Sequence, residues 1–397
     1  MADTQPMGEG PRILVVDDND DNRYTLTLYL DLEGYSNVEV AHDGEEAIAR
    51  LKTSSFDLML LDVMMPKVDG YQVLGWLKDQ THLHDLPVIM ISALNEVNSV
   101  VRCIELGAVD YLLKPFNPVM LKARLGATLE KKKLRDQVNE HLARLEEELE
   151  AARRLQMSMV PQSFPEATVQ FPIDICASME PAREVGGDLY DFFTTEDGRL
   201  CFLVGDVSGK GMPAALFMAR AKSLIRITTE LMRLHAAARP AEVIARVNRE
   251  LCQDNNDLMF VTLFFAMLAP QTGELEYCNA GHNEPYRLNG GALEAITGAK
   301  GIILGVRPDA VYATGQISLA PGESIYLFTD GVTEAHNAAG ELYSEQRLET
   351  VLRDAAGRPS AELVKSVSEA LRGFVGNALP SDDITMLAVR RLDPATV

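Results

Sequence analysis

Residues 56–62 have the sequence FDLMLLD, whose residues 58–61 form an apolar run that ends in the acidic residue Asp62. The pattern recurs in RILVVD (12–17), LPVIMIS (86–92) and VDYLLK (109–114). Apolar runs of this length, without alternation, are typical of parallel strands buried on both faces. Helical patterns lie between them, at 24–32, 44–51, 71–78 and 97–106. This alternation predicts an α/β domain with a doubly wound parallel sheet.

Polar residues end each of these runs. Because the carboxyl ends of parallel strands meet at one edge of a sheet, this edge would gather Asp17, Asp18, Asp62, Ser92 and Lys114. Three neighbouring carboxylates raise one another's pKa, and Mg²⁺, which prefers oxygen ligands, relieves that repulsion. An aspartate beside Mg²⁺ and a lysine can attack phosphorus to form an acyl phosphate. The Lys114–Pro115 bond is a candidate cis peptide.

The motifs VVDDND (15–20), LLDVMMPKVDG (60–70), MISA (90–93) and YLLKPF (111–116) resemble those of the receiver domain of bacterial two-component response regulators. The resemblance covers residues 11–128 and implies a flavodoxin-like sheet of order 2-1-3-4-5. It also implies phosphorylation of Asp62 by a sensor histidine kinase or a phosphotransfer protein. The implied Mg²⁺ ligands are Asp17, Asp18, Asp62 and the backbone carbonyl of Met64, and the implied switch residues are Ser92, Tyr111 and Lys114. The alternative is a receiver fold that has lost phosphorylation.

Residues 129–160 are rich in charge and contain neither Gly nor Pro. Apolar residues recur there at spacings of 4, 3, 4 and 3, namely Val138, Leu142, Leu145, Leu149 and Ala152. This spacing predicts a helical connector that pairs with a second copy as a short coiled coil, so that receiver and connector would form a homodimer. A helix that packs on one of its own domains is the alternative. Pro161 and Pro165 would end the helix.

Strand patterns dominate the region after residue 170. We expect strands at 173–179, 188–194, 200–206, 260–268, 274–279, 323–329 and 384–390, with helices at 213–234, 240–255 and 360–375. Strand pairs with grouped helices predict an α+β domain with two sheets flanked by helices.

Four acidic motifs punctuate this region: EVGGDLYD (184–191), VGDVSGKGMPAALF (204–217), LFTDGVTEA (327–335) and SDDITML (381–387). A single aspartate at a strand end is more often a turn former or a helix cap. Four separated motifs, each centred on Asp and without His or Cys ligands, instead favour hard cations such as Mg²⁺ or Mn²⁺. Two such ions can activate water and clamp a phosphoryl group.

Together with LQMSMVPQSFP (155–165) and NAGHNEP (279–285), these motifs resemble the metal-dependent phosphatases of the protein phosphatase 2C class, in the bacterial sporulation and stress-response branch. The resemblance covers residues 155–392. It implies hydrolysis of phosphoserine or phosphothreonine on a partner protein, an anti-sigma-factor antagonist, with two Mg²⁺ or Mn²⁺ ions. The implied metal ligands are Asp188, Asp206, the carbonyl of Val207, Asp330 and Asp382, with Asp206 bridging the ions and Asp383 competing with Asp382 for the last position.

Other residues of this region carry weaker signals. Lys210 stands where the phosphatase branch often has His, which affects only the detail of its loop. His282 could act as an acid, but a loop histidine after a strand is more often structural. Arg183 could contact the substrate phosphate, but the sequence does not favour this role.

The remaining composition narrows the class of protein. A net charge of −21 argues against a nucleic-acid partner, since phosphates would be repelled. No apolar run reaches the length of a membrane span, and the polar N-terminus lacks the apolar segment of a signal peptide. Five scattered cysteines favour free thiols and therefore a cytoplasmic protein.

We therefore expect a flexible tail at 1–10, a receiver at 11–128, a helical connector at 129–160 and a phosphatase domain at 161–397. In this hypothesis, phosphorylation of Asp62 controls the phosphatase. The alternative is a receiver-gated adaptor that binds a partner protein without catalysis. A transcription factor is disfavoured because the chain shows no helix-turn-helix and no basic face.

Overall fold

A computed structural model describes residues 10–80, 83, 85–92, 97–233, 238–393 and 395, with only the backbone described at 97–100. The expected tail, apart from Gly10, lies outside the described residues, as do Ala93 of the MISA motif and the expected helix end at Leu234. The chain divides into two compact units, Met1–Leu145 and Glu146–Val397. Each unit has its own sheets and core.

The first unit contains a five-stranded sheet whose strands all run parallel, in the order β2-β1-β3-β4-β5. This order confirms the predicted receiver fold. The strands are β1 (Ile13–Val16), β2 (Val38–Ala41), β3 (Leu58–Asp62), β4 (Val88–Ser92) and β5 (Asp110–Leu113). The edge strand β2 was not predicted, because it has four residues and three of them are only partly buried.

Helices cover both faces of this sheet. They are α1 (Asp20–Leu32), α2 (Gly44–Leu51), α3 (Gly70–Lys78), α4 (Val97–Glu105) and the start of α5 (Pro118–Met159). Leu14 and Val16 pack into one apolar cluster while Ile13 and Val15 pack into the other. Burial on both faces explains why the strand is apolar at every position.

The helix α5 is one unbroken helix that starts within the predicted receiver segment. The side chain of Asn117 accepts hydrogen bonds from the backbone of Val119 and Met120, as an N-cap does. Leu121 and Leu125 of its first turns are buried in the receiver core. Farther along, the seam residues Val138, Leu142 and Leu145 are exposed at 56%, 53% and 54%.

The second unit is built on two sheets. One has the order β13-β10-β9-β8-β7 with β14 added to β10, and the other has the order β12-β11-β15-β16-β6. The strands of the first are β7 (Leu189–Thr194), β8 (Leu200–Val207), β9 (Val261–Leu268), β10 (Glu274–Ala280), β13 (Lys300–Gly301) and β14 (Gly315–Ser318). Those of the second are β6 (Ile173–Glu180), β11 (Tyr286–Asn289), β12 (Ala292–Ala295), β15 (Ser324–Phe328) and β16 (Ile384–Arg391).

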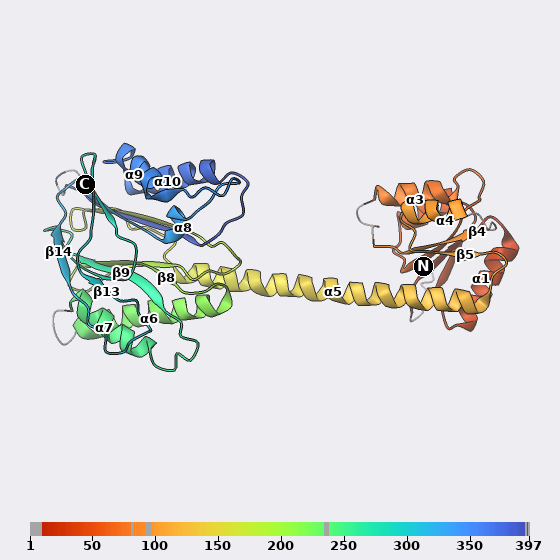
Figure 1. Cartoon of the computed structure of the whole chain (residues 1–397), viewed down its shortest axis with the longest axis horizontal. Coiled ribbons are helices and arrows are strands. Elements are labelled where there is room, and N and C mark those ends of the chain that lie inside the picture. The colour runs from red at the N-terminus through yellow and green to blue at the C-terminus, as the bar shows by residue number, and fades with distance from the viewer. Residues whose placement is uncertain are drawn as a thin grey trace, which may run out of the picture. The chain divides into compact units, whose positions relative to one another are not determined.

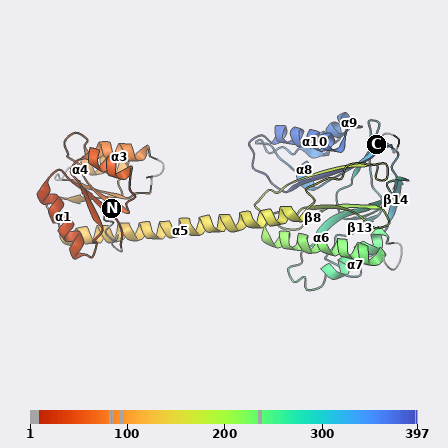
Figure 2. The ribbon, with the colours of Figure 1, turned by 180° about the vertical axis from the view of Figure 1, so that it is seen from behind.

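Helices flank the two sheets on their outer faces (Figure 1), and Figure 2 shows the same layers from behind. The helices α6 (Met212–Arg233) and α7 (Pro240–Leu251) pack on the first sheet. The helices α8 (Asp330–Thr333), α9 (Ser344–Asp354) and α10 (Ser360–Val375) pack on the second. Between the sheets lies an apolar core that includes Phe202, Phe264, Ile325 and Leu387. This arrangement confirms the predicted fold class of two sheets flanked by helices.

The elements β11 to β14, α8 and α9 of this unit were not predicted. The strands among them have two to four residues, too few to establish a period. Among the residues that the structure describes, none of the helices combines the length and apolar character that a membrane crossing requires.

Two candidate metal sites

The first candidate site lies at the carboxyl edge of the receiver sheet. Ligand oxygens of Asp17, Asp18 and Asp62 lie within 4.8 Å of one another. Asp17 and Asp62 are buried, whereas Asp18 is exposed. Parallel strands β1 and β3 are neighbours, so their ends bring the two buried carboxylates together. The trio offers hard oxygen ligands of the kind that Mg²⁺ prefers.

Lys114 joins this trio. Its Nζ lies 2.8 Å from Asp17 Oδ2 and 3.0 Å from Asp62 Oδ2. Burial raises the pKa of Asp62 to about 6, and the charge of Asp17 adds to this effect while Lys114 opposes it. One lysine thus leaves the repulsion between the carboxylates only partly compensated, as expected at a cation site. The Lys114–Pro115 peptide is cis, as the sequence analysis predicted.

The other predicted receiver residues lie around this edge. The register pairs Met90 with Tyr111 and Ser92 with Leu113, so Ser92 and Tyr111 belong to neighbouring strands and project from the same face. The Arg124 guanidinium lies over the Tyr111 ring, 4.9 Å from its centroid. Met64 follows Asp62 by two residues, and its side chain is 71% exposed.

The second candidate site lies in the other unit, where ends of both sheets bring the acidic motifs together. Asp188 directly precedes β7, and Asp206 lies near the end of β8. The β7–β8 register pairs Leu189 with Gly205, and one further step along it places Asp188 opposite Asp206. Asp330 begins α8 one residue beyond Thr329, which follows β15, and Asp382 and Asp383 directly precede β16, the neighbour of β15.

The electrostatics of these carboxylates show that they converge. Burial, together with the charges of Asp330, Asp382 and Asp383, raises the pKa of Asp206 to about 7. Burial and the charge of Asp206 raise the pKa of Asp188 well above its usual range. Burial, Glu334 and Asp382 raise the pKa of Asp330. Such mutual repulsion favours cations that would share these oxygens.

The second site is wider than the first. Among the described residues, only the receiver carboxylates form a trio with ligand atoms within 4.8 Å of one another. The carboxylates of the second site nevertheless raise one another's pKa, so they lie around a common volume. The Lys210 Nζ donates to Asp382 Oδ2 at 2.9 Å and to the Ser381 carbonyl at 2.6 Å. It is a cationic group at the rim of this volume.

Asp382 and Asp383 have different surroundings. Asp383 is buried; its Oδ1 accepts from the Ala182 N–H at 2.8 Å and its Oδ2 from the Gly187 N–H at 2.6 Å. Asp382 has a 41% exposed side chain whose oxygens accept from Lys210 and from the Asp383 N–H. The oxygens of Asp383 are therefore committed to the backbone of the loop before β7.

Glycines make this packing possible. A Cβ atom on Gly186 would lie 2.2 Å from Asp383 Oδ2, and one on Gly331 would lie 1.9 Å from the Asp383 carbonyl oxygen. No side chain fits at either position without displacing this aspartate. The motifs GGD and TDG thus contain glycine because Asp383 approaches both loops closely.

Two neighbouring residues complete the site. Thr329, which the sequence analysis did not single out, donates from Oγ1 to Asp188 Oδ2 at 2.8 Å and accepts from the Thr385 N–H at 3.0 Å. His282 is buried, with its Nδ1 2.9 Å from Thr262 Oγ1, and burial lowers its pKa to about 4. Because His282 is buried and neutral, it is better suited to a structural role than to the role of a catalytic acid. Arg183 lies exposed in the loop before Asp188.

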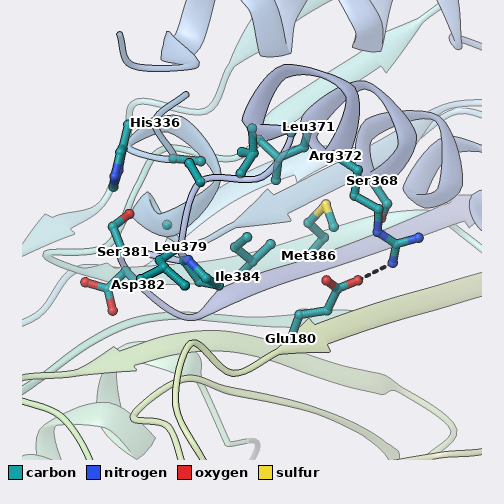
Figure 3. A pocket seen from close by; sticks show the side chains of 16 residues that line it. Glu180, His336, Ser368, Leu371, Arg372, Leu379, Ser381, Asp382, Ile384 and Met386 are labelled. Atoms are coloured by element: carbon teal, nitrogen blue, oxygen red, sulfur yellow. Dashed lines mark hydrogen bonds and ion pairs between the residues drawn. The ribbon is translucent and has the colours of Figure 1, made fainter. Parts of the chain in front are cut away.

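A pocket of about 230 Å³ opens beside Asp382 (Figure 3). Its lining is mostly apolar and comes from α10, the following loop and β16. The Arg372 Nη2 and Glu180 Oε1 atoms form an ion pair at 2.5 Å in its wall. Gly331 and Asp382 line the pocket as well as the carboxylate site. Leu379, which is 83% exposed, lies at its mouth.

Sequence comparisons identify the families that the two units resemble. Residues 13–126 match the response regulator receiver domain, and residues 196–392 match Stage II sporulation protein E (SpoIIE). Protein IcfG of Synechocystis is 32% identical over 62% of this chain and 41% of its own length. The phosphoserine phosphatase RsbU of Bacillus subtilis is 29% identical over 62% of this chain and 71% of its own length. The chain thus spans less than half of IcfG.

A solved structure supports the fold of the second unit. The SiaA-PP2C domain of Pseudomonas aeruginosa superposes with a TM-score of 0.55 and 24% identity, covering 64% of this chain and 99% of that domain. Fold and sequence together define a receiver joined to a phosphatase-class domain. The chain carries an N-terminal response regulator receiver domain and a C-terminal SpoIIE-type domain of the protein phosphatase 2C class of serine/threonine phosphatases.

Proposed function

We propose that this chain is a two-component response regulator whose receiver, phosphorylated on Asp62, controls a metal-dependent protein serine/threonine phosphatase. The observation that carries the catalytic half is the convergence of Asp188, Asp206 and Asp330, whose pKa values burial and mutual repulsion raise. Buried carboxylates that repel one another are suited to hold cations, because a cation relieves the repulsion. The ions would be two Mg²⁺ or Mn²⁺ in this site and one Mg²⁺ in the receiver.

Asp206, from the middle of the cluster, would be a ligand of the two ions, with the Val207 carbonyl as a further ligand. Of the last pair, Asp382 is the better ligand, because the oxygens of Asp383 already accept backbone hydrogen bonds. Two divalent ions supply charge that activates a water molecule and neutralises the phosphoryl oxygens. Thr329 would hold the Asp188 carboxylate in one orientation through its hydroxyl group.

The substrate would be phosphoserine or phosphothreonine on a partner protein. Similarity to RsbU, a phosphoserine phosphatase, supports this class and favours an anti-sigma-factor antagonist. The apolar pocket beside Asp382 suits the residues that flank such a phosphoserine, since it shares Gly331 and Asp382 with the carboxylate site. A phosphoryl group at the cations would bring its neighbouring residues to this pocket.

The receiver would respond to a sensor histidine kinase or a phosphotransfer protein. Lys114 and the two buried carboxylates form the polar edge that an acyl phosphate on Asp62 needs for neutralisation. Ser92 and Tyr111, on neighbouring strands, would change conformation when Asp62 is phosphorylated. Five free cysteines, Cys103, Cys176, Cys201, Cys252 and Cys278, favour a cytoplasmic location.

The connector would pair with a second copy of the chain. Val138, Leu142 and Leu145 are more than half exposed on α5, although all three are apolar and follow a heptad spacing. Pairing would bury this seam. Sedimentation equilibrium of the wild-type chain and of Leu142→Asp tests the proposal: a dimer that Leu142→Asp dissociates is expected, and a monomeric wild type contradicts it.

Hydrolysis of p-nitrophenyl phosphate by the full chain tests the catalytic proposal. We expect turnover with Mn²⁺, loss of turnover with EDTA, and loss in Asp206→Asn. The matched control is Asp309→Asn, because Asp309 is a largely exposed carboxylate paired with Arg307. An inactive wild type that still binds a partner protein in a receiver-dependent manner would favour the adaptor alternative.

A further inference from the structure

Gln156, in the last turn of α5, is a buried polar residue that the proposed chemistry does not use. Its side chain is 4% exposed. Both ends of its amide bind a single residue: the Gly186 N–H donates to Oε1 at 3.0 Å, and Nε2 donates to the Gly186 carbonyl at 2.6 Å. Burying an amide is unfavourable unless its polar groups form hydrogen bonds. Here the backbone of Gly186 provides a partner for the Gln156 amide oxygen and another for its amide nitrogen. The contact therefore fixes Gly186 at two points.

Gly186 lies two residues before Asp188, in the loop that Asp383 holds from another side. A Cβ on Gly186 would lie 2.2 Å from Asp383 Oδ2, and the next residue, Gly187, donates to the same oxygen at 2.6 Å. The loop is thus held between the Gln156 amide and the Asp383 carboxylate. Neither contact can change without a shift of the backbone that carries Asp188.

The last turn of α5 is also anchored on the far side of Asp188. Val160 is buried in the core between the sheets, and Met157 packs against that core. The Tyr190 hydroxyl donates to the Pro161 carbonyl at 2.6 Å. Contacts from the end of the connector therefore reach residue 186 before the aspartate and residue 190 after it. A rotation or withdrawal of this turn would act on both sides of Asp188.

We infer that Gln156 is a positioning residue that ties the end of the connector helix to the backbone of Asp188 and thereby sets the affinity of the second site for its cations. The inference rests on the proposed phosphatase function and specifies its regulation. A receiver-driven change in the connector reaches the metal centre through this amide. Residues that orient metal ligands affect metal affinity or activity by about 10- to 100-fold when they are replaced.

The test uses the full chain with Gln156→Met, which keeps the length of the side chain and removes both hydrogen bonds. Mn²⁺ binding to the metal-stripped protein is measured by titration calorimetry, independently of activity. We expect Mn²⁺ affinity to fall about tenfold or more, and kcat at a fixed subsaturating Mn²⁺ concentration to fall within the same range, with KM for p-nitrophenyl phosphate little changed. Gln137→Met, at an exposed position of the same helix, should match the wild type.

A second variant distinguishes the loss of a hydrogen bond from misfolding. Gln156→Glu keeps the shape and the acceptor for the Gly186 N–H, but an ionised carboxylate cannot donate to the Gly186 carbonyl. Its Mn²⁺ affinity relative to the wild type should therefore recover as pH falls and the glutamate becomes protonated. Unchanged Mn²⁺ affinity in both variants would overturn the inference, as would an affinity loss that merely follows the loss of melting temperature. An inactive wild type would refute the proposed function instead, while the calorimetric comparison would still decide the role of Gln156.

Discussion

The Gly187 N–H donates a hydrogen bond to Asp383 Oδ2 over 2.6 Å, although 196 residues separate the two in the chain. This bond joins the loop before β7 to the loop before β16, and therefore one sheet to the other. Both loops carry aspartates of the candidate phosphatase site. The relative position of these aspartates thus depends on a buried carboxylate that has no need to contact a cation.

Asp383 and Asp382 should respond oppositely to replacement. Asp383→Ala leaves the buried Gly187 N–H and the part-buried Ala182 N–H without acceptors, and the buried group alone costs about 1–3 kcal/mol. We expect a clear fall in the free energy of unfolding, measured by urea denaturation. Asp382→Ala should leave stability nearly unchanged and lower Mn²⁺ affinity. The reverse pattern would assign the ligand role to Asp383.

Gly331→Ala should disrupt the site through packing alone. Its Cβ would lie 1.9 Å from the Asp383 carbonyl oxygen, so the backbone must shift. Overpacking of this kind costs about 1–3 kcal/mol, and we expect a comparable loss of stability together with loss of Mn²⁺-dependent turnover. Gly373→Ala in α10 is the control, because its Cβ meets open space and should be neutral or slightly stabilising. A fully active Gly331→Ala would show that the two loops need not approach so closely.

Receiver chemistry should depend on Asp62 and Lys114 in different ways. With acetyl phosphate and Mg²⁺, we expect the wild type to incorporate one phosphoryl group that base and hydroxylamine release, as for an acyl phosphate, and Asp62→Ala to incorporate none. Lys114→Met removes the ammonium 3.0 Å from Asp62, so phosphorylation should persist but fail to alter phosphatase turnover. Equal turnover of the phosphorylated and unphosphorylated wild type would refute the coupling between the two domains.

His282 should make the fold sensitive to acid. Burial lowers its pKa to about 4, below the ordinary value of 6.5, so between these pH values the unfolded chain binds a proton that the folded chain excludes. This contribution to stability is fully present above pH 6.5 and is lost as pH falls towards 4. From pH 7 to pH 5 the wild type should lose about 2 kcal/mol more than His282→Gln. His141→Gln, at an exposed position of α5, should instead follow the wild type.

Leu379 offers a test of the substrate pocket. It is 83% exposed at the mouth beside Asp382, so Leu379→Asp should fold normally. We expect KM to rise about tenfold for a phosphoserine peptide with apolar flanking residues, because an apolar contact of this size is worth 1–3 kcal/mol. KM for p-nitrophenyl phosphate should not change. Val311→Asp, at an 88% exposed position, is the matched control, and an equal KM rise for both substrates would exclude the pocket.

The local patterns of the sequence predicted much of the fold. The four apolar runs of the receiver became β1, β3, β4 and β5, and the first three of these strands are buried on both faces and therefore almost entirely apolar. The predicted helices at 44–51, 71–78 and 360–375 end within one residue of α2, α3 and α10. The half-exposed edge strand β2 and the short strands β11 to β14 were missed, since two to four residues carry no reliable period.

The sequence by itself determined which residues could hold cations, because aspartates at the ends of apolar strands are brought to the sheet edges by the strands themselves. Only the tertiary structure decided how they are held. Asp383 accepts a hydrogen bond from Gly187, and the Gln156 side chain is hydrogen-bonded to Gly186. The partners in each pair are too far apart in the chain for a local sequence pattern to predict the contact. Hydrogen bonds between residues so far apart form only after both sheets and the last turn of α5 have packed, so their partners depend on the folded whole.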